Sequence, residues 1–212
     1  MEYSHVIREY LSSCGITGIE EKLEQLTAFQ GYLREANEKV NLISRQADAA
    51  DIWYNHILDS ILIIRFVSFS QETILDFGSG GGLPGIPLKI LFPETRMYLL
   101  DSRNRKMEAV RNILKKLDLT ECFPITSRLE ELDRSWEGYF DVILSRSVRQ
   151  ERVFKQAMEK LLVRQGKVLL YKSQKLDDLE IFPFYKSYNI SHPRVGTRIL
   201  IEIKKEMFHM EH

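Results

Sequence analysis

One segment constrains the fold of this chain more than any other: residues 74–85, with the sequence ILDFGSGGGLPG. It is typical of a short apolar strand, an acidic residue, a glycine-rich turn and a proline in the first turn of a helix. Roughly 20 residues later, a second apolar stretch ends in Leu-Leu-Asp-Ser, with Asp101 at the spacing of an acidic residue that binds a nucleotide ribose. Together the two segments predict a parallel sheet that binds an adenosine-containing cofactor at its carboxyl-terminal edge.

The size and composition of the chain suit one α/β domain with an appendage. It has 212 residues, of which 44% are hydrophobic and 28% charged, as in a soluble globular protein. The longest apolar run, residues 61–67, is too short to span a bilayer. Cys14 and Cys122 are far apart, lack a metal-binding spacing and follow no secretory leader. We therefore expect a cytoplasmic protein without disulfides, bound metal or contact with a membrane.

Charge is distributed unevenly along the chain. The formal net charge is zero, but residues 1–60 contain ten Asp or Glu against five Lys or Arg. Residues 145–175 contain nine Lys or Arg against two Asp or Glu. This basic segment predicts a phosphate or polyanion partner, although a solvated helix face would explain the charges equally well.

The order of apolar patterns predicts an α/β fold in which a mostly parallel sheet has helices on both faces. Residues 1–70 form an expected N-terminal helical extension packed on the main domain, with helices at 20–39 and 48–66. Residues 71–205 form the expected cofactor-binding domain, and residues 206–212, including His209 and His212, a frayed tail. For residues 177–191 we expect a poor helix and an edge strand, and we expect strand 197–203 to close the sheet. The other expected strands are 73–77, 96–100, 122–126, 140–144 and 167–171, with helices at 84–92, 103–117 and 149–163.

The glycine loop can be aligned with two cofactor patterns. Gly80-x-Gly82-x-x-Gly85 formally matches the dinucleotide pattern, which would indicate a nicotinamide-dependent oxidoreductase. The spacing Tyr171-x-x-x-Lys175 resembles a reductase tyrosine–lysine pair, but such a pair requires a helix and Tyr171 ends an expected strand.

The second frame, Asp76-x-Gly78-x-Gly80, is the more natural one and suits S-adenosylmethionine. This cofactor has no phosphate but carries an ammonium and a sulfonium, so we expect Asp76 to face its cationic side. The glycines would let the backbone approach the ligand closely, and Asp101 would accept hydrogen bonds from the ribose.

Two further loops follow expected strands. Leu129, through its amide, and Glu130 are candidates to bracket the adenine, although a helix N-terminus would explain Glu130 and Glu131 as well. Arg146 lies where active sites form in open sheets and is a candidate to line the cofactor or substrate crevice.

Several other residues allow a structural interpretation as well as a functional one. Trp53, His56 and Asp59 share one helix at three-residue steps. Trp53 is expected in the core, and a hydrogen-bonded structural pair is favoured for His56 and Asp59 over a role in the crevice. Candidates for phosphate contacts share the expected helix 103–117: Arg103, Arg105, Lys106, Arg111, Lys115 and Lys116.

Over residues 37–205 the chain resembles the bacterial small-subunit ribosomal RNA methyltransferase G family, formerly called glucose-inhibited division protein B. The resemblance rests on the glycine loop with its tail LPGIPL, on LLDS at 99–102 and on Ser145-Arg146. Asn41-Leu42, W-x-x-H-x-x-D-S at 53–60, Lys172 and the strand at Arg198 also match.

The resemblance implies a Rossmann-like class I methyltransferase that uses S-adenosylmethionine to methylate N7 of one guanine in small-subunit ribosomal RNA. It carries cofactor positions over onto Gly78, Leu83, Leu129, Glu130 and Arg146. Methyl transfer to N7 does not demand a general base, because N7 carries a lone pair and no proton, so the sequence singles out no catalytic residue. Nothing in the sequence indicates an obligate protein partner. Ser147, Glu108 and Ala109 depart from the family pattern, so a non-catalytic RNA- or ribosome-binding relative stays an alternative.

Overall fold

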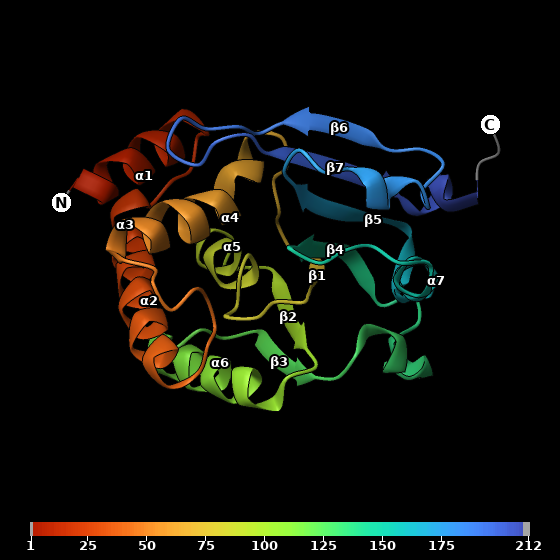
Figure 1. Cartoon of the computed structure of the whole chain (residues 1–212), viewed down its shortest axis with the longest axis horizontal. Coiled ribbons are helices and arrows are strands. Elements are labelled where there is room, and N and C mark those ends of the chain that lie inside the picture. The colour runs from red at the N-terminus through yellow and green to blue at the C-terminus, as the bar shows by residue number, and fades with distance from the viewer. Residues whose placement is uncertain (1, 210–212) are drawn as a thin grey trace.

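The computed structural model describes residues 2–209, and its centre is a seven-stranded sheet (Figure 1). The strand order is β3-β2-β1-β4-β5-β7-β6. The first five of these strands are parallel, whereas β7 is antiparallel to both of its neighbours. The predicted mostly parallel sheet is therefore confirmed. The strands are β1 (Thr73–Phe77), β2 (Arg96–Asp101), β3 (Cys122–Thr126), β4 (Phe140–Arg146), β5 (Leu162–Lys172), β6 (Lys186–Asn189) and β7 (Ile199–Lys204).

Helices cover the two faces of the sheet unequally. In Figure 1 α1 to α6 lie on one side and α7 lies on the other. Because successive side chains of a strand point to opposite faces, Ile74 packs with the first group whereas Leu75 packs toward α7. The helices are α1 (Glu2–Ser13), α2 (Ile19–Lys39), α3 (Ala49–Asp51), α4 (Asp59–Ile61), α5 (Gly85–Leu91), α6 (Asn104–Leu117) and α7 (Arg152–Leu161). Short 3₁₀ turns follow at Leu129–Glu131, Arg134–Trp136, Asp177–Leu179 and Lys205–His209.

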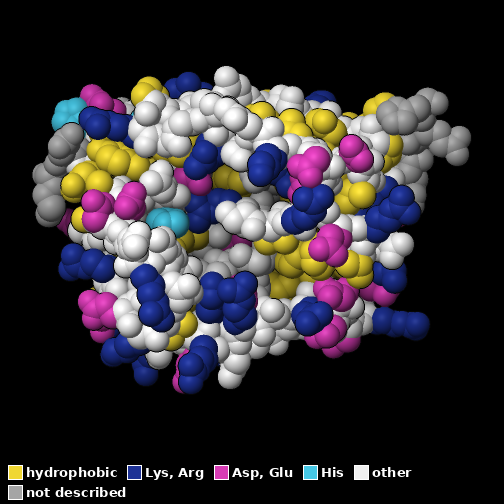
Figure 2. All heavy atoms as spheres, viewed as in Figure 1, with side chains coloured by type: hydrophobic (Ala, Val, Ile, Leu, Met, Phe, Trp, Pro, Cys, Tyr) yellow, Lys and Arg dark blue, Asp and Glu magenta, His cyan; other side chains and the backbone are white. Residues whose placement is uncertain are grey.

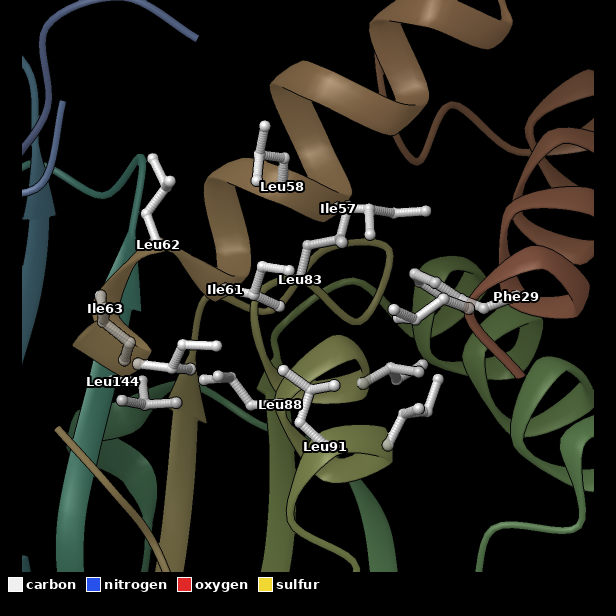
Figure 3. Packing of buried hydrophobic residues seen from close by; sticks show 14 of the residues in the cluster. Phe29, Ile57, Leu58, Ile61, Leu62, Ile63, Leu83, Leu88, Leu91 and Leu144 are labelled. Atoms are coloured by element: carbon white, nitrogen blue, oxygen red, sulfur yellow. The ribbon is translucent and has the colours of Figure 1, made fainter. Parts of the chain in front are cut away.

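The N-terminal helices share one hydrophobic core with the sheet. The predicted stripe of α2, which includes Phe29, is buried. The helix predicted at 48–66 changes type along its length, from α3 through a π-helix at Ile52–Leu58 to α4 and a 3₁₀ turn at Leu62–Arg65. Its apolar side chains, such as Ile57 and Ile61, face α5 across the core (Figure 3).

Two expectations for the C-terminal half are corrected. The helix predicted at 149–163 is shorter, because the chain already enters β5 at Leu162. The expected edge strand is β6, so β7 does not close the sheet but lies between β5 and β6. In this position Leu200, Ile201 and Ile203 are all fully buried, as expected for an interior strand whose two faces are covered.

The predicted tail at 206–212 is also partly wrong. Phe208 is 1% exposed and packs edge-on against Phe182, because the turn Lys205–His209 lies beside β5 and β7. His212 and the side chain of His209 lie outside the described part of the chain. Within residues 2–209, no helix is long and apolar enough to cross a membrane.

Candidate functional site

The glycine loop joins β1 to α5 in the conformation that its glycines permit. Gly78, Gly80 and Gly82 have φ values of 76°, 55° and 83°, in the left-handed region that side chains disfavour. A Cβ on Gly78 would lie 2.5 Å from Cγ2 of Val148, so a larger residue has no room there. Helix α5 begins at Gly85, directly after Pro84, as predicted.

Asp76 does not face a ligand surface, which corrects the expectation that it does. Its side chain is fully buried, and its Oδ2 accepts a hydrogen bond of 2.8 Å from the Gly85 amide. The first amides of a helix have no partner within the helix, and the carboxylate satisfies one of them here. Burial raises the pKa of Asp76 from 3.8 to about 7, while the bond from Gly85 and the charge of Arg146 act in the opposite direction.

Asp101 ends β2 and holds two neighbouring segments in place. Its Oδ2 accepts from the Gly80 amide at 3.2 Å, and its Oδ1 accepts from the Arg103 amide at 2.9 Å. One carboxylate therefore fixes both the glycine loop and the start of α6. Asp101 is 8% exposed, and the exposed part borders a cavity.

This cavity of about 280 Å³, the glycine-loop pocket, brings together four of the predicted cofactor residues: Gly78, Asp101, Leu129 and Glu130. Its apolar wall was not predicted from the sequence. The rings of Phe77 and Phe154 meet edge-to-face at 5.0 Å, and Val148 lies beside them. The remaining lining residues are Leu100, Ser102, Arg103, Ser127 and Arg128.

The predicted residues Gly80 and Leu83 do not line this pocket. Gly80 stands behind it, where its amide binds Asp101. Leu83 is 4% exposed, and its side chain lies in the core near Ile57 and Ile61 (Figure 3). Leu83 can therefore contribute to a cofactor site only through its backbone, whose amide donates to Ser79.

Arg146, the seventh predicted residue, lines a second cavity of about 530 Å³, the arginine pocket. Val148 lines both cavities, so the two pockets adjoin. Nη1 of Arg146 lies 2.9 Å from Oδ2 of Asp59, and Nε of Arg198 lies 2.8 Å from Oδ1 of the same carboxylate. The other lining residues are Ser147, Arg149, Tyr171, Lys172, Ser173, Lys175, Asp177 and Asp178. Figure 2 shows Lys and Arg side chains around a hollow near the middle of this face.

The comparisons with known proteins identify the family. A family model described as rRNA small subunit methyltransferase G matches residues 22–194. A Ribosomal RNA small subunit methyltransferase G from Chlorobium phaeobacteroides is 38% identical over 177 residues, which cover 81% of this chain and 78% of the relative. The relative of the same name from Mesoplasma florum is 35% identical over 164 residues, 77% of this chain and 69% of its own length. The chain belongs to this family.

Solved structures support the same fold at low sequence identity. A SAM dependent methyltransferase from Aquifex aeolicus superposes with a TM-score of 0.57 at 13% identity, over 73% of this chain and 92% of that one. M. jannaschii TYW2 in complex with AdoMet gives a TM-score of 0.54 at 13% identity, over 75% and 77% of the two chains. These likenesses confirm the predicted Rossmann-like class I methyltransferase fold.

Membership of the methyltransferase G family contradicts the oxidoreductase alternative, and so does Tyr171. This side chain is 5% exposed on β5, and its hydroxyl donates to the Ser60 carbonyl at 2.7 Å. Burial raises the pKa of Tyr171 well above 10. A tyrosine held in this way is not a proton donor for a substrate.

The expected pair of His56 and Asp59 is not formed. Asp59 binds two arginines instead, and it lines the arginine pocket, while a role of Asp59 in the chemistry of the crevice stays a prediction. Burial, with the nearby charge of Arg146, lowers the pKa of His56 to about 4. Trp53 is 5% exposed in the core, as predicted.

Of the cations predicted to contact phosphate in or next to α6, three already have partners in the protein. Nζ of Lys116 lies 2.7 Å from Glu35 of α2, Arg111 donates to Thr126, and Nε of Arg103 lies 3.9 Å from Oδ1 of Asp101. Glu108 and Ala109, which depart from the family pattern, line a groove of about 690 Å³ between α2 and α6.

Unsatisfied polar atoms gather where β1 and β4 end. Oδ1 of Asp76 and the hydroxyl oxygens of Ser79 and Ser145 are buried without a hydrogen-bond partner. Such atoms are rare in proteins, and none of these three residues lines either of the two pockets. Within residues 2–209, no group of three or more His, Cys, Asp or Glu is placed to hold a metal ion.

Proposed function

We propose that this protein transfers a methyl group from S-adenosylmethionine to N7 of a guanine in small-subunit ribosomal RNA. The observation that carries the proposal is the junction of two pockets at the carboxyl-terminal edge of the sheet. The glycine-loop pocket has the size and polarity for the adenosine end of the cofactor, and the arginine pocket beside it is suited to a nucleotide.

The residues of the glycine-loop pocket suit S-adenosylmethionine. Asp101 would accept hydrogen bonds from the ribose hydroxyls, and Glu130 with the Leu129 amide would bind the edge of the adenine. Gly78 lets the backbone approach the ligand, while Gly80 and Leu83 shape the loop behind it. When bound, the cofactor supplies a methyl group on a positively charged sulfur.

Arg146 would hold the carboxylate of the cofactor at the junction of the pockets. Its Nη1 is bound to Asp59 and to the Asn55 carbonyl, but Nε and Nη2 have no hydrogen-bond partner among the described residues. A guanidinium with two donors left over matches a carboxylate, and such charge-assisted bonds are the strong ones.

The arginine pocket would receive the target nucleotide. Arg149 is exposed at its rim, and Lys175 also lines the cavity. Contacts from these cations to the RNA backbone would be independent of sequence and would position the substrate, while the pocket selects the base. RNA recognition of this kind requires the target base to leave its stack.

The reaction does not demand a general base, because N7 of guanine carries a lone pair and no proton. Methyl transfer to it is an in-line displacement that depends on how well the reacting atoms are aligned and on the local field. The residues described here therefore bind and orient, and no side chain is assigned a proton transfer. This accounts for a site whose acidic groups are engaged with amides, lysine or arginine.

A cytoplasmic location belongs to the same proposal. Its support is the presence of two free cysteines, Cys14 and Cys122, together with a small-subunit ribosomal RNA substrate.

The first experiment is calorimetric titration with S-adenosylmethionine, with NADH as the parallel ligand. We expect micromolar binding of S-adenosylmethionine alone. The second step supplies labelled cofactor with small-subunit RNA and with small ribosomal subunits, and identifies the methylated nucleoside by mass spectrometry. Binding without transfer to either substrate would favour the non-catalytic RNA-binding alternative, and no binding would refute the proposal.

A further inference from the structure

We infer that Asp59 is a positioning residue that aims the guanidinium of Arg146 at the junction of the two pockets. Asp59 itself is 5% exposed and does not have to touch a ligand to act. The inference rests on the proposed function only through the contact between Arg146 and the cofactor.

A single carboxylate joins three distant parts of the chain. Asp59 begins α4, Arg146 ends β4, and Arg198 precedes β7. Each oxygen of the carboxylate takes one arginine, Oδ2 from Nη1 of Arg146 at 2.9 Å and Oδ1 from Nε of Arg198 at 2.8 Å. The side chain of Arg146 is 11% exposed and that of Arg198 25%. The carboxylate therefore lies between two guanidiniums that would otherwise repel each other.

The bond to Asp59 determines which donors of Arg146 remain for a ligand. Nη1 is shared between Asp59 and the Asn55 carbonyl, the latter at 3.3 Å. With one corner of the planar group anchored, its Nε and Nη2 edge can take only a narrow range of directions. An arginine without this anchor would sample many rotamers, and ordering it on binding would cost affinity.

The backbone that carries Asp59 is itself rigidly held. Its neighbours Leu58 and Ser60 are both fully buried, and the Ser60 carbonyl accepts from Tyr171 at 2.7 Å. The preceding segment, Ile52–Leu58, is a π-helix. This form is rare in proteins overall, but where it occurs it is often part of a functional site. Asp59 can therefore transmit a fixed position to Arg146.

A purely structural role for Asp59 makes a different prediction. Removing one partner of a buried ion pair destabilises a protein in either case, because a charge is left without its partner. Only a positioning role, however, makes the effect on cofactor affinity depend on Arg146. Two residues that act through one contact have non-additive effects, whereas independent residues have additive ones.

The test is a double-mutant cycle on S-adenosylmethionine affinity, measured by calorimetry on the full chain. We expect Asp59→Asn to weaken binding about tenfold in the wild-type background and less than about twofold in the Arg146→Ala background. Effects that add in the two backgrounds would overturn the inference. If Asp59→Asn does not fold, Asp59→Glu, which keeps the charge but displaces it by one methylene, completes the same cycle.

Asp178→Asn is the matched control. Asp178 is 7% exposed, lines the same pocket and binds Lys172 and the Gln150 amide, but not Arg146. Its effect on affinity should add to that of Arg146→Ala. Coupling of equal size for Asp178 would show a general weakening of the pocket and would overturn the inference.

A spectroscopic arm separates failure of the inference from failure of the proposed function. NMR of the ligand-free protein follows the Arg146 side chain through its Nε–H signal and the rotation of its guanidinium. We expect hindered rotation in the wild type and free rotation in Asp59→Asn, and unchanged rotation would refute the positioning role. Absence of cofactor binding by the wild type would instead refute the proposed function, while the NMR result still decides the role of Asp59.

Discussion

The two adjoining pockets are built in different ways. In the glycine-loop pocket, the polar contacts are local: Asp101 binds amides 21 and 2 residues away, each next to the end of a strand. In the arginine pocket, Asp59 reaches Arg146 across 87 residues and Arg198 across 139. The first pocket uses backbone amides and left-handed glycines, and the second uses buried ion pairs between side chains.

This difference predicts different sensitivities. A pocket made by backbone conformation fails when a Cβ is added, because neither the turn nor its neighbour can move cheaply. A pocket made by long-range ion pairs fails when one charge is removed, because the remaining charge is left buried. The predictions below test whether the two halves of the site are separable in this sense.

The largest effect is expected for Gly78→Val. The substitution forces a β-branched residue into a φ of 76° and brings its Cβ to 2.5 Å from Val148. We expect S-adenosylmethionine affinity to fall by more than about 100-fold, corresponding to about 3 kcal/mol. Calorimetry measures this loss, and circular dichroism measures how much of the fold is retained.

Gly138→Val is the matched control. Gly138 also has a left-handed φ, of 63°, but a Cβ there meets nothing within 4 Å, and the residue lines neither pocket. The control should share the backbone strain while keeping the affinity within about threefold of wild type. Equal loss of binding in both variants would mean that strain anywhere in the domain, rather than the local clash, removes the pocket.

The second prediction concerns the pH dependence of stability and uses Asp76→Asn. The folded-state pKa of Asp76 is raised from 3.8 to about 7, so between these values folding takes up a proton. The contribution of Asp76 is therefore fully present below pH 4 and is lost as the pH rises to about 7. At about 1.4 kcal/mol per pKa unit, the loss amounts to a few kcal/mol.

Asparagine keeps an acceptor for Gly85 and removes the titration. Relative to wild type, Asp76→Asn should therefore be more stable at pH 8 than at pH 4, as measured by urea unfolding of the ligand-free protein across this range. A difference in unfolding free energy that does not vary with pH would contradict the raised pKa.

The third prediction concerns His56, near Arg146 of the arginine pocket. Here the pH dependence of stability has the opposite sign to that of Asp76. The pKa of His56 is lowered from 6.5 to about 4, chiefly by burial and further by Arg146. The contribution of His56 is fully present above pH 6.5 and is lost as the pH falls to about 4. His56→Gln should therefore lose less stability than wild type on acidification from pH 7 to pH 4.5.

We expect a smaller effect than for Asp76, because His56 is not completely buried. The same urea titrations measure it. Identical acid sensitivity of His56→Gln and wild type would place the histidine in a more solvated setting than the structure indicates.

How much of each pocket could be predicted depends on whether its residues are close together in the sequence. Strand ends, the glycine turn and Asp101 belong to continuous segments of sequence, so patterning alone located four residues of the glycine-loop pocket. The apolar wall was missed, because Phe154 and Val148 come from a helix and a loop whose placement depends on tertiary packing. Asp76 was found but misassigned, since its pattern does not show that a helix amide will take the carboxylate.

The arginine pocket was harder to predict for a physical reason. The sequence favoured His56 as the partner of Asp59 and indicated no partner for Arg198, and only the folded chain brings Asp59 and Arg198 into one carboxylate–guanidinium cluster. In the sheet, the same limitation affected β7: its pattern predicted a strand, but its position between β5 and β6 depends on pairings between strands that sequence periodicity does not encode.

The smallest effect is expected for Tyr171→Phe. This variant tests whether the arginine pocket can be destabilised without an effect on the glycine-loop pocket. The variant removes the hydroxyl that binds the Ser60 carbonyl, next to Asp59, and leaves the ring in the core. Loss of one buried hydrogen bond should cost about 1 kcal/mol of unfolding free energy, as measured in urea. Affinity for S-adenosylmethionine should change less than about threefold, because Asp59 keeps both arginines. A loss of affinity as large as that of Asp59→Asn would show that the contact of Tyr171 with α4, and not the ion pairs alone, determines where Arg146 points. The two pockets could then not be perturbed separately.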